Sequence, residues 1–202
     1  MLVNELIGCQ TFPCQDVNKE CYLVPTVEIN PDSVTIIMIS EASPADPTNY
    51  YYAAGQPSFQ QTTVTAFNDA GIGVSSLRDL LDMGVYFTTA VKCGKTGYGI
   101  QTQTIKECSC ILEKELDLLP NVRAYLLMGD VAIKAVNEIA RRSGTGRAIP
   151  AGSTYKLRGQ EYRFRGARAF PSYLQVGPGF NIEKSKRRMI AEDIAAALKI
   201  TG

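Results

Sequence analysis

The stretch "VYFTTAVKCGKTGYG", Val85–Gly99, decides how the rest of the chain can be interpreted. Its first seven residues are β-branched, aromatic or small, which is the composition of a buried strand. The sequence then becomes polar and rich in glycine, and it presents a thiol at Cys93. Packing alone does not explain why a buried strand ends on a lysine and a cysteine, so these two residues are candidates for a functional role.

Two further segments have the same strand-like composition. They are "SVTIIMIS" at 33–40 and "VRAYLLMG" at 122–129, and a fourth strand is expected within "EYRFRGARAF" at 161–170. Near-continuous apolar runs of this length are typical of strands that are covered on both faces. The pattern predicts parallel strands in the middle of the molecule.

Helical patterns alternate with these strands. One begins at Thr104 with threonine as the expected N-cap, one begins at Asp130, and the last covers roughly Glu183–Lys199. Strands alternating with helices predict the α/β class, as a three-layer αβα sandwich around a central four-stranded parallel sheet. We expect one domain over residues 1–202, with an N-terminal arm that carries cysteines over residues 1–30.

Composition narrows the function classes. The 202 residues are 45% hydrophobic, and 21 basic residues nearly balance 20 acidic ones, so no global field attracts nucleic acid or acidic membranes. No apolar run has the length of a membrane span, and the N-terminus lacks the pattern of a signal peptide. We expect a cytoplasmic monomer with no membrane partner.

The chain has six cysteines and no histidine. Cytosolic thiols are kept reduced, so a disulfide framework explains six cysteines poorly. The absence of histidine removes most zinc sites, histidine-dependent nucleophiles and the usual neutral-pH base. Acid–base chemistry must therefore use Asp, Glu, Lys or Tyr.

Ligands of open parallel α/β sheets bind beyond the carboxyl ends of the strands. The segments that leave these ends are rich in Gly, Pro, Ser, Thr or aromatic residues, although any such fold needs turns there. They read "SEASPADPTNYYY", "TTAVKCGKTG", "GDVA" and "FPSYLQVGPGF".

The order and content of these loops resemble the uracil-DNA glycosylase superfamily, especially its iron-sulfur-containing branch. The resemblance covers about Cys9 to Leu198 and rests on five motifs at near-family spacing. The matching residues are Ser40–Pro44, Thr88–Cys93, Cys108 with Ile111 and Leu112, Met128–Gly129, and Phe170–Leu174, followed by a basic helix with Glu192–Ile194.

The resemblance implies a [4Fe-4S] cluster held by four cysteine thiolates. Cys93 and Cys108 match the family positions directly, and Cys9 and Cys14 are the chosen N-terminal pair, with Cys21 as the substitute. A four-cysteine zinc site is the inorganic alternative, because sequence does not distinguish the two kinds of sulfur site.

Buried free thiols are the structural alternative for these cysteines, because free Cys packs as a small hydrophobic residue. Cys110 lies two residues after Cys108 on the same expected helix. Its side chain should therefore point away from the other thiols.

The resemblance also implies hydrolysis of the N-glycosidic bond of a damaged base, uracil or a related deaminated base, that is flipped from DNA. Glu41 would be the catalytic carboxylate that positions or activates water, with Asp46 as the alternative acid. Tyr51 competes with the aromatic residues expected to stack on the base. The residues expected to contact the base are Ser40, Ala42, Tyr52, Phe59, Thr89 and Phe170.

Two departures from the family affect this chemistry. Thr89 replaces the asparagine that pairs with the uracil edge, and one hydroxyl lacks the separate donor and acceptor of an amide. Phe170 replaces the histidine that stabilises the negative charge developing on the base, and it donates no hydrogen bond. Loss of one such donor costs roughly 10²- to 10³-fold in rate.

DNA contacts are expected from the loop and helix that follow the last strand. An apolar wedge there can unstack a base step, and cations at the helix start can contact phosphates, although a solvated helix face explains those cations equally well. The expected DNA-binding residues are Pro171, Ser172, Leu174, Lys184, Lys186 and Arg187.

Three function classes remain open. The first is a DNA-repair N-glycosylase, and the second is a catalytically weak or silent iron-sulfur module of the same fold that binds nucleic acid. The third is an unrelated phosphate or nucleotide binder that uses "GKTGYG", although this stretch lacks the full phosphate-loop pattern.

Overall fold

The computed structural model describes residues 1–177 and 179–201, and its centre is a mixed six-stranded sheet. The strand order is β1-β3-β2-β4-β6-β5. The four inner strands are parallel, and each edge strand is antiparallel to its neighbour. The strands are β1 (Val17–Asn18), β2 (Ile36–Ser43), β3 (Val85–Lys95), β4 (Ala124–Met128), β5 (Tyr162–Phe164) and β6 (Ala167–Ser172).

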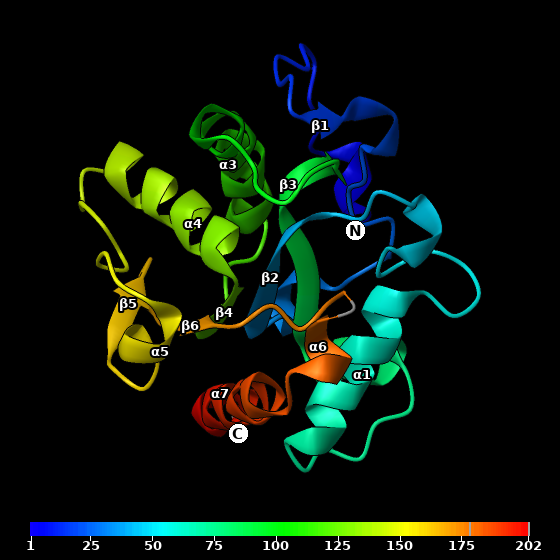
Figure 1. Ribbon diagram of the computed structural model, residues 1–202, viewed down its shortest axis with the longest axis vertical. Coiled ribbons are helices and arrows are strands. Elements are labelled where there is room, and N and C mark those ends of the chain that lie inside the picture. Colours follow the sequence, from blue (N-terminus) through cyan, green and yellow to red (C-terminus); the bar gives the residue numbers. More distant parts are fainter. Residues whose placement is uncertain (178, 202) are drawn as a thin grey trace.

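Helices cover both faces of this sheet. Figure 1 shows α3 and α4 on one side and α1 and α7 on the other. The helices are α1 (Ser58–Asp69), α2 (Leu77–Asp82), α3 (Thr102–Asp117), α4 (Asp130–Arg142), α5 (Thr154–Leu157), α6 (Gly179–Ile182) and α7 (Lys184–Thr201). Short 3₁₀ helices occupy Val3–Glu5, Lys19–Cys21, Pro31–Ser33 and Pro47–Asn49.

The strand side chains alternate between two separate apolar cores. Along β2, Ile37 and Ile39 pack with the residues of α3 and α4, whereas Ile36 and Met38 pack with those of α1, α2 and α7. All four side chains are buried. This double burial explains why the inner strands have near-continuous apolar sequences, and it confirms the predicted α/β class.

The predicted four parallel strands are only the centre of the sheet. The segment 161–170 forms a hairpin rather than a single strand, because the chain reverses at Arg165 and Gly166, both with positive φ. At the other edge, β1 pairs with the end of β3. The sheet is therefore mixed, and these short antiparallel pairings cap its parallel centre.

One predicted helix cap is wrong. The helix expected from Thr104 begins at Thr102, after the N-cap Gln101, and the Thr104 hydroxyl bonds to Asp16 instead. The side-chain partner competes with the capping role. The helix expected from Asp130 does begin there, after Gly129 as N-cap, and the Asp130 carboxylate forms an ion pair with Lys134.

A buried charged network joins β3 to α3. Lys92 Nζ lies 2.5 Å from Glu115 Oε2, and both side chains are fully buried. Lys92 also donates to Thr88 Oγ1, and Tyr86 and Thr88 donate to Glu115 Oε1. A buried charge is tolerated only when it is paired and hydrogen-bonded, so this network fixes the register of β3 against α3.

Asp16 ties the N-terminal arm to the segment between β3 and α3. Its carboxylate accepts hydrogen bonds from the Gln101 N–H, at 2.6 Å, and from the Thr104 hydroxyl, and its carbonyl accepts one from Thr96 Oγ1. Figure 1 shows the arm, in blue, beside α3 and the end of β3.

None of the helices in the described part of the chain is both long enough and apolar enough to span a bilayer.

Candidate functional site

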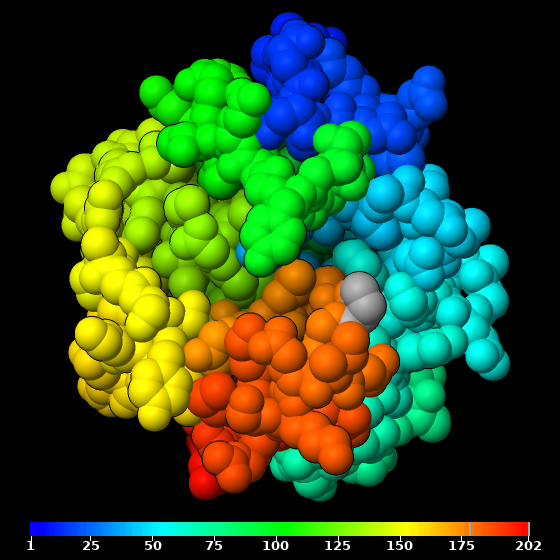
Figure 2. All heavy atoms as spheres, viewed as in Figure 1, coloured from blue at the N-terminus to red at the C-terminus, as the bar shows by residue number. Residues whose placement is uncertain are grey.

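A cleft of about 640 Å³ lies beyond the carboxyl ends of the inner strands, and we call it the Glu41 cleft. Figure 2 looks onto this face, where the green segment after β3 lies opposite the orange segment around α6. Five of the residues expected at the site line the cleft. They are Glu41, Ser172, Leu174, Lys186 and Arg187.

Two neighbours set the position of the Glu41 carboxylate. Lys95 Nζ lies 3.0 Å from Glu41 Oε2, and the side chains are 29% and 16% exposed. Glu41 also packs against Gly129, where a Cβ atom would lie 2.7 Å from Glu41 Oε1. Gly129 has φ of +101° and precedes α4, whose N-terminal dipole favours a negative charge. These two contacts hold the Glu41 carboxylate at the lining of the cleft.

An anchor beneath the cleft holds the end of β6. The Ser172 hydroxyl donates to Asp193 Oδ2 at 2.6 Å, and Arg158 donates to both carboxylate oxygens of Asp193. Burial raises the pKa of Asp193, while the hydrogen bonds from Ser172 and Arg158 act in the opposite direction. The anchor fixes the position from which the loop after β6 departs.

The residues expected to contact the base lie deeper, within the layers of the fold. Ala42 is buried near the end of β2 and Thr89 in the middle of β3, and Thr89 Oγ1 is 3.5 Å from Ser43 Oγ. Phe170 is buried in the core that packs against α7. Its ring lies beneath the Arg168 guanidinium, 5.0 Å from the ring centroid.

Aromatic side chains fill the space between β2, β3 and α1. The Phe59 ring packs edge-on against Tyr51 at 5.3 Å, and Tyr52 donates from its hydroxyl to the Phe87 carbonyl at 2.8 Å. Phe59 and Tyr51 are buried, and Tyr52 is partly buried. Burial raises the pKa of Tyr51 and Tyr52, so both hydroxyls stay neutral.

Ser40 belongs to a buried hydrogen-bond network. Its hydroxyl bonds to the Tyr51 hydroxyl, and Gln175 Nε2 donates to Tyr51 at 2.7 Å and to Ser40 at 3.2 Å. All three residues are buried. Tyr51 and Gln175 therefore occupy the side of Ser40 that was expected to contact a ligand.

The expected DNA-binding residues have mixed surroundings. Pro171 is buried within β6, whereas Lys184 is exposed at the start of α7. Lys186 forms an ion pair with Glu183, and Arg187 forms one with Asp69 on α1. Asp46, the alternative acid, is exposed, does not line the cleft, and accepts hydrogen bonds from Thr48, which lower its pKa.

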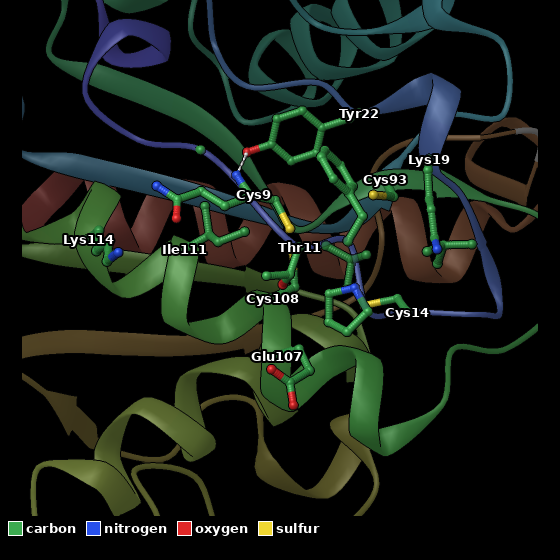
Figure 3. A pocket seen from close by; sticks show the side chains of 16 residues that line it. Cys9, Thr11, Cys14, Lys19, Tyr22, Cys93, Glu107, Cys108, Ile111 and Lys114 are labelled. Carbon is green, nitrogen blue, oxygen red and sulfur yellow. Dashed lines mark hydrogen bonds between the residues drawn. The ribbon is translucent and has the colours of Figure 1, made fainter.

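A second cavity, of about 250 Å³, is lined by four cysteines, and we call it the cysteine pocket. Figure 3 shows these cysteines around the pocket, contributed by the N-terminal arm, the end of β3 and α3. They are the four predicted ligands Cys9, Cys14, Cys93 and Cys108. The chain therefore brings together residues that lie up to 99 positions apart in sequence.

Hydrogen bonds and backbone conformation shape this pocket. The Lys92 N–H donates to Cys108 Sγ at 3.2 Å, and the Cys9 N–H donates to the Tyr22 hydroxyl at 3.0 Å. Between Cys9 and Cys14, Phe12 adopts φ of +44°. A non-glycine residue held in this region signals a constrained loop.

The thiols of the pocket influence one another's ionisation. Burial, together with the neighbouring thiols, raises the pKa of Cys93 to about 12 and that of Cys108 to about 11. Such a set releases protons when a cation binds, because thiolates are the ligands. The four thiols and the N–H···S bond suit an iron-sulfur cluster. No group of three His, Cys, Asp or Glu side chains within residues 1–177 and 179–201 is arranged to hold a single metal ion.

The other two cysteines have different surroundings. Cys21 is buried outside the pocket, accepts a hydrogen bond from Asn18 and donates to the Ala45 carbonyl at 3.2 Å. A Cβ atom on Gly94 would lie 2.7 Å from Cys21 Cβ, so the two backbones approach closely there. Cys110 is exposed on α3, as its spacing from Cys108 predicts.

The sequence prediction assigns no role to three residues of these sites. Lys95 pairs with Glu41, Gln175 closes the buried network, and Asp193, named there only as part of the Glu192–Ile194 motif, anchors Ser172. Lys95 has a local signal, because it is the second lysine of "KCGKTG" and ends β3, the strand that runs beside β2. The partners of Gln175 and Asp193 are distant in sequence, and nothing local indicates them.

Comparison with known proteins gives one local similarity. A 58-residue stretch is 38% identical to the type-5 uracil-DNA glycosylase of Thermus thermophilus. It covers 29% of this chain and 26% of the relative, so the match spans about a quarter of the relative's length. No protein-family model matches the chain. The similarity supports a relationship to the uracil-DNA glycosylase superfamily.

Proposed function

We propose that the chain is a DNA N-glycosylase of the uracil-DNA glycosylase superfamily that acts on uracil or a related deaminated base. The observation that carries this proposal is the position of Glu41 in a cleft beyond the carboxyl ends of the parallel strands, held by Lys95 and Gly129. The local similarity to a uracil-DNA glycosylase supports the choice of substrate class.

In the proposed reaction the glycosidic bond between C1′ and the base breaks, and its electron pair leaves with the base. A water molecule forms the new bond to C1′, and its proton passes to the Glu41 carboxylate. The ion pair with Lys95 holds this carboxylate in place at the cleft. Glu41 is therefore the proposed base of the reaction.

The departing base carries negative charge that needs a hydrogen-bond donor. Neither the Phe170 ring nor the buried Thr89 hydroxyl is placed to supply one in the Glu41 cleft. Without such a donor, excision should be roughly 10²- to 10³-fold slower than in a site that has one. We expect slow excision that is measurable in single-turnover experiments.

We also propose that the cysteine pocket holds a [4Fe-4S] cluster on Cys9, Cys14, Cys93 and Cys108. Bound there, the cluster would fasten the N-terminal arm to β3 and α3. Cys21 is the less suitable ligand because it lies outside the pocket, beside Ala45. A tetrahedral zinc site is the alternative that metal analysis must separate.

The test is a single-turnover assay on oligonucleotides that carry uracil or hypoxanthine, followed by alkaline cleavage at the abasic product. Glu41→Gln should abolish excision, whereas Asp130→Asn, which also alters an ion-paired acid of the cleft, should retain it. Equal activity in the wild type and Glu41→Gln would contradict the assigned role of Glu41.

A catalytically silent DNA-binding module is the second candidate function. It is favoured by the burial of Phe59, Thr89 and Phe170, since a flipped base would have to displace packed side chains to reach them. Binding to DNA without excision of any lesion by the wild type would support this candidate over the enzyme. Size-exclusion chromatography of the same sample would test the expected monomer.

A further inference from the structure

We propose that exposed aromatic side chains around the Glu41 cleft stack on unpaired bases, so that the chain binds single-stranded DNA in preference to duplex. This inference rests on the proposed function only for the identity of the polymer as DNA. The surface itself is argued from exposure, position and charge.

Three large hydrophobic side chains stand in solvent on segments that contribute to the lining of the cleft. Tyr98 is 103% exposed and lines the cleft, Tyr155 is 71% exposed, and Ile182 is 76% exposed. Tyr155 directly follows the lining residue Thr154, and Ile182 directly precedes the lining residue Glu183. Exposed apolar groups gathered at one place mark a binding surface, whereas scattered ones need no explanation.

The arrangement of these segments suits a polymer that crosses the cleft. Tyr98 lies in the segment after β3, while Tyr155 belongs to α5 and Ile182 to α6. Figure 1 shows α5 and α6 apart from the end of β3, and Figure 2 shows the hollow between these segments. A strand laid across the hollow would meet an aromatic ring on more than one side.

Unpaired cations lie close in sequence to two of these exposed side chains. The four cations that line the cleft are all ion-paired within the chain. Lys156 and Lys184 are exposed, next to Tyr155 and two residues after Ile182, and neither has an ion-pair partner among residues 1–177 and 179–201. These two lysines are therefore free to contact phosphates.

Stacking on tyrosine selects unpaired nucleotides. In a duplex the flat faces of the bases are covered by their neighbours, whereas a single strand presents them to protein side chains. Stacking of one base on one aromatic ring is sequence-tolerant, because every base has such a face. The surface should therefore bind single strands with little sequence preference and with affinity that falls as salt rises.

The experiment measures fluorescence anisotropy of a labelled oligothymidine and of the same strand paired with oligoadenosine. The wild type should bind the single strand more tightly. Tyr98→Ala and Tyr155→Ala should each weaken single-strand binding by about 5- to 150-fold. Tyr98→Phe should stay within about twofold of the wild type because it keeps the ring. Met83→Ala removes an exposed apolar side chain that does not line the cleft, so it should change nothing.

Two results would overturn this inference. One is single-strand binding by Tyr98→Ala and Tyr155→Ala that equals the wild type, and the other is tighter binding of the duplex by the wild type. The excision assay separates the two proposals. Tyrosine-dependent single-strand binding without excision contradicts the glycosylase alone, and excision with no tyrosine dependence of binding contradicts the stacking surface alone.

Discussion

The cysteine pocket and the Glu41 cleft are predicted by the same set of motifs, but they collect their predicted residues to different extents. All four chosen cysteines line one pocket, although they come from the arm, β3 and α3. Of the residues expected to act on or contact a base, only Glu41 lines the cleft, while Phe59, Thr89 and Phe170 are packed inside.

The physical requirements of the two regions explain this difference. Thiolates can share a cluster only if all of them surround one centre, so a single misplaced cysteine would remove the site. A base-binding position has no such requirement, because an apolar side chain can replace a polar one and still fill the space. Phe170 is such a case, since its ring completes the core that packs against α7.

The largest expected effect tests the cysteine pocket. Protein purified without oxygen should contain about four irons per chain, and Cys108→Ala should lose nearly all of them because a ligand is missing. Iron analysis and an absorbance scan measure this. Cys110→Ala, which changes the exposed cysteine two residues later, should keep its iron. Iron retained in Cys108→Ala would contradict the cluster, and a colourless protein with one zinc would favour the zinc site.

The next largest effect tests the buried network of Lys92 and Glu115, which joins β3 to α3. Glu115→Leu leaves the Lys92 ammonium buried without its partner and should lower the free energy of unfolding by about 3–5 kcal/mol. The double variant Lys92→Met with Glu115→Leu should recover most of this loss. Urea unfolding measures both, and a single variant as stable as the wild type would contradict the role of the buried network.

A smaller effect tests the cleft. Gly129→Ala should cost about 1–3 kcal/mol, because its φ of +101° is unfavourable for alanine. It should also reduce excision, since the new Cβ displaces the Glu41 carboxylate. Gly144→Ala has a similar φ problem but no atom within 4 Å of the added Cβ, so it should keep its activity. Equal activity losses in both variants would show that strain, rather than contact with Glu41, is responsible.

The smallest effect serves as a reference away from both regions. Hydrogen bonds from Ser75 lower the pKa of Asp79 from its ordinary value of 3.8 to about 2. A lowered carboxyl pKa stabilises the fold above pH 3.8, and that contribution is lost as the pH falls towards 2. Thermal unfolding between these pH values should therefore be less pH-dependent in Asp79→Asn. Iron content and DNA binding at neutral pH should not change, and a change in either would link α2 to the sites.

The inner strands could be predicted from sequence because each is apolar on both faces, as the alternate packing of Ile37 and Met38 shows. The N-cap of α3 could not be predicted, because Thr104 bonds to Asp16, which lies 88 residues earlier. The turn at Arg165 and Gly166 also escaped prediction, since a short hairpin and one strand have similar local patterns.

The candidate sites divide in the same way. Cysteine spacing and family resemblance together indicated which thiols to group, and the fold places those thiols around one pocket. The pairing of Glu41 with Lys95 depends on how β2 and β3 align, and a register shift between Ala42 and Ser43 alters that alignment. Such irregularities have no local sequence signal, so "KCGKTG" offers Lys95 as a candidate but does not show that it pairs with Glu41.

The contacts of Asp16 can form only late in the synthesis of the chain. The arm is synthesised first, yet the groups that Asp16 binds, at Thr96, Gln101 and Thr104, emerge only after 80 or more further residues. Until then Asp16 lacks these three partners, and the arm can contact only nearby residues such as Tyr22 and Ile29. If the proposed cluster binds in the cysteine pocket, its four ligands can meet only after translation has passed Cys108 on α3, which would make its insertion a late step in the maturation of the chain.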